Sequence, residues 1–235
     1  MNDFETASSE PEPMTLLQRA TGVFYQPRAV MNAVAGNPTW VGPLLLVLGL
    51  GVLTAFLIPD EVMEQSTRNM LSKMPGGDAA AAELDSQDFS ATSVTNLLSI
   101  VFTTIITGLL IALWGLLLFR GILGGEGHFK QYFSMVLISG VIASVGGLVS
   151  IPIQIQSGDL FAFLSVGTLL PFLGEGFLRT WMNAISLFTI WQCIVLGIGA
   201  NCIDKDLGRV GATLAFLLPA VAITMVGSAV WQIFA

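Results

Sequence analysis

Charge is scarce in this sequence: Asp, Glu, Lys and Arg make up 11% of its 235 residues, against about 25% in soluble domains. A soluble chain of this length would need a charged shell around its core. Hydrophobic residues instead make up 54% of the chain, and the mean hydropathy is +0.78. Lipid must therefore cover much of the surface, which predicts an integral membrane protein.

Residues that commonly form catalytic or metal sites are equally few. One histidine, His128, and two cysteines form no credible metal set, and the motifs of metalloproteases, serine hydrolases and phosphate-binding loops are missing. The net charge of -7 and the lack of a basic cluster argue against nucleic acid as a partner. No ionisable side chain falls at the centre of a predicted span, which disfavours an ion-coupled transporter. We therefore expect no enzymatic activity, no catalytic residues, no metal and no cofactor.

The few charges are placed so that they leave long charge-free runs. Five of these runs exceed the roughly 20 residues that a membrane-spanning helix needs, and they cover residues 29–59, 89–119, 131–158, 180–203 and 210–235. They predict an all-α, polytopic membrane helix bundle that occupies residues 37–235. Its five transmembrane helices would lie at about 38–58, 95–119, 132–155, 181–203 and 211–234, with an extracytoplasmic loop over 59–93.

A sixth charge-free run, residues 160–174, is too short for an ordinary span and contains Gly167 and Pro171. It is a candidate re-entrant or interfacial segment, with a shallow sixth span as the alternative. Pro219 lies in the middle of the last predicted span and predicts a kink there. In the third span Ser139, Ala143 and Gly147 recur every four residues, which predicts close helix packing inside the bundle or, alternatively, against a partner helix.

The chain before the first span divides into two parts. Residues 1–13 are acidic and poor in apolar groups, which predicts disorder. Residues 14–36 predict two amphipathic interfacial helices, the first with a capping box at Thr15 and Gln18. Gln18 and Arg19 would face away from its apolar side. Ordinary packing of both helices against the bundle is the alternative.

The distribution of lysine and arginine predicts the orientation. With five spans and the N-terminus inside, the cytoplasmic side receives more cations, namely Arg19, Arg28, Arg120, Lys130, Lys205 and Arg209, than the far side, which receives Arg68, Lys73 and Arg179. The N-terminus is therefore expected in the cytoplasm and the C-terminus outside it.

Two stretches of the sequence share a pattern with a known family. Residues 24–45 hold Pro27, Pro38, Trp40 and Pro43, and the loop between the second and third spans holds Gly124, Gly125, Gly127, Phe129, Lys130 and Gln131. Together they resemble the prokaryotic branch of the Yip domain family (Ypt-interacting proteins). There an aromatic-x-x-Pro segment precedes a Pro-x-Trp start of the first helix, and a Gly-rich, Phe-Lys-Gln loop joins helices two and three.

The resemblance implies five membrane helices, a cytoplasmic N-terminus and a bacterial inner membrane. Eukaryotic relatives bind prenylated small GTPases, but the acidic and tyrosine-rich motifs of that branch have no match here. In physical terms Pro27 and Pro38 would rigidify the approach to the membrane, Trp40 would anchor at the headgroups, and the three glycines would permit a turn with positive backbone angles. A well-made helical hairpin turn and a recognition loop both fit the glycine-rich stretch.

Two functions follow as hypotheses. The first is a non-enzymatic membrane scaffold or adaptor that organises a partner protein or a lipid, with lipid binding near Lys130. The alternative is a facilitator or transporter component for a lipid or an uncharged small molecule, which predicts a polar or lipid-filled cavity between the spans. The sequence leaves the identity of the partner and the oligomeric state open.

Overall fold

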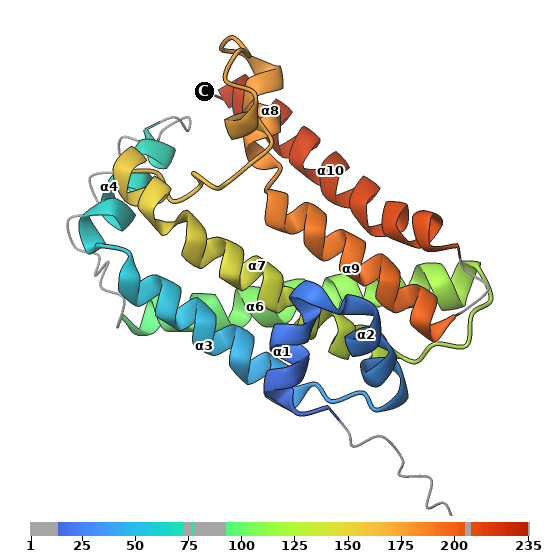
Figure 1. Cartoon of the computed structure of the whole chain (residues 1–235). Helices are drawn as coiled ribbons and strands as arrows, with labels where there is room; N and C mark the ends of the chain where they lie inside the picture. The colour runs from blue at the N-terminus through green and yellow to red at the C-terminus, as the bar shows by residue number, and fades with distance from the viewer. Residues whose placement is uncertain (1–13, 73–76, 78–92, 205–207, 235) are drawn as a thin grey trace, which may run out of the picture.

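The computed structural model describes residues 14–72, 77, 93–204 and 208–234, and within these ranges the chain is almost entirely helical (Figure 1). The predicted disorder of residues 1–13 lies outside the described residues. Residues 14–72 form the helices α1 (Leu16–Tyr25), α2 (Pro27–Gly36), α3 (Val41–Leu57) and α4 (Asp60–Leu71). From residue 93 onward the elements are α6 (Val94–Gly115), the π-helical turn η2 (Leu116–Ile122), α7 (Phe129–Ser157), the 3-10 turn η3 (Gly167–Leu169), α8 (Phe177–Ala184), α9 (Leu187–Ile203) and α10 (Arg209–Phe234).

Every predicted span is helical over most of its length, but the helices differ in how well they match a bilayer. Among the helices in the described residues, three are long and apolar enough to cross it alone: Val94–Ile122, Phe129–Ser157 and Arg209–Gln232. A fourth is added if α3 and α4, bent by 92°, count as one span. Helices α3 and α9 have 17 residues each, or about 26 Å of rise against a hydrocarbon core of about 30 Å. By length and composition three to four spans are supported, and the count of five stays a prediction.

The predicted fourth span, 181–203, is divided at Ile185 and Ser186, where the chain passes from α8 into α9. There the backbone is extended and pairs with the preceding loop through a bridge between Ser165 and Ser186. Val166 N–H donates to the Ile185 carbonyl at 2.9 Å, and Leu187 N–H donates to the Leu164 carbonyl at 3.0 Å. The candidate re-entrant segment 160–174 is therefore an irregular loop fixed to the break, and η3 is its longest helix.

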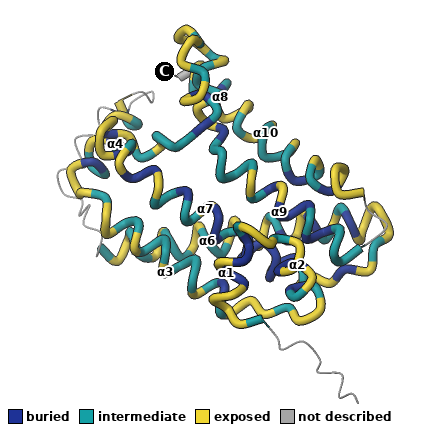
Figure 2. Tube along the Cα trace, in the orientation of Figure 1, coloured by how far each residue is buried: buried dark blue, intermediate teal, exposed yellow. Residues whose placement is uncertain are grey.

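Helix α7 lies at the centre of the bundle, with α3, α6 and α9 packed around it (Figure 2). Ser139 is fully buried, and a Cβ added to Gly146 would overlap the ring of Phe188 on α9. Close packing inside the bundle is thus confirmed for this helix. The predicted four-residue register holds only in part, because Ala143 is exposed and an added Cβ at Gly147 would meet nothing within 4 Å.

Helices α1 and α2 pack on the bundle through their apolar faces. Val23, Val30, Met31 and Val34 are fully buried and belong to the main hydrophobic core. The predicted capping box is confirmed: the Thr15 N–H donates to the Gln18 side chain at 2.8 Å, and the Gln18 N–H donates to Thr15 Oγ1 at 3.3 Å. Both helices therefore pack against the bundle, which was the alternative to an interfacial position. A position at the membrane surface stays a prediction.

Pro219 lies inside α10, and its missing N–H leaves the Ala215 carbonyl, four residues earlier, without its helical donor. The indole of Trp114 on α6 supplies a replacement, donating from Nε1 to the Ala215 oxygen at 3.0 Å. The hydrogen bond ties α6 to α10. It also satisfies a backbone acceptor that has no water partner in hydrocarbon.

Replacing Trp114 with phenylalanine is expected to destabilise the protein by about 1–2 kcal/mol, because the Ala215 carbonyl loses its donor. The measurement is unfolding in detergent followed by circular dichroism. In a Pro219→Ala background the restored N–H can reach the Ala215 carbonyl, so Trp114→Phe should then cost less. Equal costs in the two backgrounds would contradict the role given to this hydrogen bond.

Candidate interaction surface

The two motif stretches, about ninety residues apart in sequence, meet at one end of the bundle. The side-chain amide of Gln131, at the start of α7, donates to the Ala35 carbonyl near the end of α2 at 2.8 Å. The rings of Trp40 and Phe133 lie 6.1 Å apart between centroids. We call this contact region, formed by residues 35–43 and 124–133, the junction. The structure thus brings together residues that the sequence singled out separately.

Gln131 has two tasks in the junction. Its Oε1 accepts from the His128 N–H at 2.8 Å, which closes a capping box at the first turn of α7. Its Nε2 makes the bond to Ala35 that holds α2 in place. Only a side chain with both an acceptor and a donor can do this. Beside it, the ring of Phe129 stacks on Phe133 with centroids 5.7 Å apart.

The glycine-rich loop needs its glycines for two different reasons. Among the three, only Gly124 has a positive φ, +74°, so the prediction of positive backbone angles is wrong for Gly125 and Gly127. At those two positions the constraint is space. A Cβ on Gly125 would overlap the carboxylate of Asp204, and one on Gly127 would lie 2.6 Å from the Tyr132 hydroxyl.

Arg19 holds the approach to α3, a role that the sequence interpretation missed. Its side chain is 3% exposed rather than facing away from the bundle. Its guanidinium donates to the Met14 carbonyl at 3.2 Å, to the Asn37 carbonyl at 3.1 Å and to Thr39 Oγ1 at 3.0 Å. Burial lowers the pKa of Arg19, yet arginine stays charged in proteins. Nothing in the sequence indicated this burial, because an arginine on an amphipathic helix ordinarily lies on its polar face.

The prolines and Trp40 shape the same approach. Pro27 is the first residue of α2. Pro38 precedes α3, which begins at Val41 rather than at Pro38, and Pro43 is buried in its first turn. Trp40 is the N-cap residue of α3 and is 40% exposed. A partly exposed indole at the start of an apolar helix suits the headgroup region.

The end of the bundle that contains the junction, here called the junction end, has a buried part that holds the fold together and an exposed part. The exposed side chains there include two large apolar groups, Leu17 at 73% and Tyr25 at 68% exposure. The same end carries four exposed cations, Arg28, Arg120, Lys130 and Arg209. Arg120 also donates to the Gly127 carbonyl at 3.3 Å, which fixes the glycine-rich loop. The open part therefore mixes apolar and positive groups.

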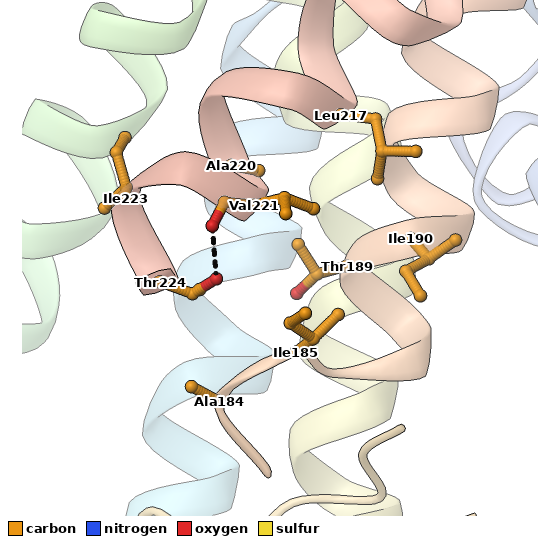
Figure 3. Close-up of a pocket in the computed structure, with 9 residues that line it drawn as sticks. All are labelled: Ala184, Ile185, Thr189, Ile190, Leu217, Ala220, Val221, Ile223 and Thr224. Atoms are coloured by element: carbon orange, nitrogen blue, oxygen red, sulfur yellow. Dashed lines mark hydrogen bonds between the residues drawn. The ribbon is translucent and has the colours of Figure 1, made fainter. Parts of the chain in front are cut away.

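A separate cavity of about 230 Å³ lies between α9 and α10, away from the junction (Figure 3). Its lining is almost wholly apolar and comprises Ala184, Ile185, Thr189, Ile190, Leu217, Ala220, Val221, Ile223 and Thr224. Within the described ranges no group of three or more His, Cys, Asp or Glu residues could hold a metal ion.

A helical bundle of this hydropathy, with exposed apolar faces on several helices, is a polytopic membrane protein. The model of the Yip1 domain matches residues 21–231, so the chain belongs to the Yip1 domain family. It is 24% identical over 211 residues to the membrane protein YknW of Bacillus subtilis strain 168, covering 83% of this chain and 84% of that protein. No solved structure matches significantly. The resemblance noted in the sequence is therefore confirmed.

Proposed function

We propose that the protein is a non-enzymatic scaffold of the Yip type, whose junction end organises a partner protein or lipid at the membrane. The observation that carries the proposal is the convergence of the two motif stretches through Gln131 and Ala35. The junction sets the positions of the residues around it. Within the junction, Phe129 and Lys130 are exposed, so they are free to contact another molecule.

The proposal places the junction end in the cytoplasm. Arg28, Arg120, Lys130 and Arg209 are exposed at this end, and lysine and arginine are enriched on the cytoplasmic side of membrane proteins. Each such cation near an anionic leaflet contributes about 1 kcal/mol of attraction. The membrane would be the bacterial inner membrane, with the C-terminus on its far side.

Two charge reversals test which kind of molecule this end organises. The protein is extracted with its native lipid into nanodiscs, and mass spectrometry measures co-purifying proteins and anionic lipids for the wild type, Lys130→Glu and Arg209→Glu. Both positions are exposed cations, but only Lys130 belongs to the motif. A substitution at Gly125 would be a poor test, because a Cβ there overlaps Asp204.

A partner protein lost with Lys130→Glu and kept with Arg209→Glu would support a specific adaptor surface. Anionic lipid reduced about fivefold or more by either reversal would support lipid organisation, since each reversal removes attraction and adds repulsion. Unchanged protein and lipid in both variants would exclude the proposal.

A facilitator for a lipid or an uncharged small molecule is the second candidate. The observation that favours it is the cavity between α9 and α10, since this function predicted a cavity between spans. An assay of lipid or solute movement in proteoliposomes tests it directly.

A further inference from the structure

The antiparallel helices α9 and α10 are in close contact at Gly197 and Thr213. A Cβ added to Gly197 would overlap the Thr213 hydroxyl and would lie 2.5 Å from the Cα and 2.6 Å from the N of Thr213, so Gly197 lies directly against the backbone of Thr213. Moving away from this point, α9 runs back toward its start at Leu187 and α10 runs forward through Pro219. The seam between them therefore begins as a tight contact.

The same seam opens beyond Pro219 into the 230 Å³ cavity. Ile185, Thr189 and Ile190 line one wall, and Ala220, Val221 and Thr224 line the other, as the labelled side chains in Figure 3 show. Ala220 has the smallest side chain on the α10 wall. The cavity is thus a continuation of the helix seam that the side chains of the two helices leave unfilled.

The surroundings of the opening are apolar and exposed. Leu218 is 61% exposed, Ile223 72% and Ile194 42%, all on the same two helices. Both helices are apolar along their length, and α10 is long enough to cross the membrane. In a membrane, the exposed apolar side chains of these two helices would face lipid acyl chains.

Water and a further helix both fit this cavity poorly. A buried water needs two to four polar partners, whereas the lining offers two hydroxyls, and that of Thr224 already donates to the Val221 carbonyl at 2.8 Å. A helix is about 10 Å across, too wide for a gap lined by side chains of two adjoining helices.

We propose that this seam binds a single acyl chain of a membrane phospholipid, inserted between α9 and α10 next to Pro219. The chain replaces the side-chain contacts that the opening lacks and so completes the packing of α10. The site is independent of the junction, and its test does not depend on the scaffold function.

The full-length protein is reconstituted in nanodiscs that contain a phosphatidylcholine with a photoreactive diazirine in the middle of one acyl chain. Mass spectrometry then maps the labelled residues after irradiation. Labelling is expected to concentrate at residues 184–190 and 217–224, above the level on α6, where Phe102, Ile106 and Leu110 are at least 51% exposed but do not line this cavity.

Ala220→Phe fills the seam and should remove the excess labelling. Ala222→Phe is the matched control, because Ala222 is exposed two residues further along α10 and does not line the cavity. It should leave the excess unchanged. Labelling no higher than on α6, or an excess that survives Ala220→Phe, would overturn the proposal. The wild-type comparison with α6 decides the question even if Ala220→Phe fails to fold.

Discussion

Gly197→Ala is expected to destabilise the protein by about 3 kcal/mol, at the upper end of overpacking effects. The reason is that the new Cβ would meet the backbone of Thr213, which cannot move aside as a side-chain end can. Helix α10 would have to shift away from α9, the helix it packs against most extensively. Unfolding in mixed detergent micelles, followed by circular dichroism, measures the loss.

Gly227→Ala is the matched control, since Gly227 lies on α10 and an added Cβ there meets nothing within 4 Å. Alanine in place of glycine in a helix then stabilises by roughly 0.5–1 kcal/mol. If Gly197→Ala unfolds with the same midpoint as Gly227→Ala, the backbone contact between α9 and α10 is not what holds these helices together.

The helices themselves could be predicted from the sequence, because the position of a membrane helix depends on a local property, the length of an apolar run. The break between α8 and α9 could not. Residues 180–203 are uniformly free of charge, and the chain extends at Ile185 and Ser186 because its backbone pairs with the loop at 164–166. That pairing is a tertiary contact, which the hydropathy of the sequence does not predict.

The junction was predictable in its residues but not in its contacts. The motif pattern marked Trp40 and Gln131, yet nothing local relates them to Phe133 and Ala35, which they contact. Gly125 and Gly127 illustrate the same limit. Glycine in a loop suggests a turn, whereas these two glycines allow close approach by Asp204, which follows α9, and by Tyr132 in the first turn of α7.

Arg19→Met is expected to cost about 3 kcal/mol, because a hydrogen bond to a charged group contributes about 1.5–3 kcal/mol and the variant loses three of them. The acceptors lost are the Met14 and Asn37 carbonyls and the Thr39 hydroxyl. Methionine keeps the length and the apolar stem of the side chain, so the difference reports mainly on the guanidinium. The effect should be concentrated in residues 14–43, where hydrogen exchange measured by mass spectrometry would rise.

Arg19→Lys should recover only part of this loss, since an ammonium retains the charge but cannot reproduce the planar fork that reaches three acceptors at once. Arg28→Met is the control on the neighbouring helix, because Arg28 is exposed and surface substitutions usually change stability by less than about 0.5 kcal/mol. Faster exchange in Arg19→Met alone would show that Arg19 ties α1 to the start of α3. If Arg19→Met and Arg28→Met exchange alike, the three hydrogen bonds do not hold the junction in place, and the rigid end on which the scaffold proposal depends loses its structural basis.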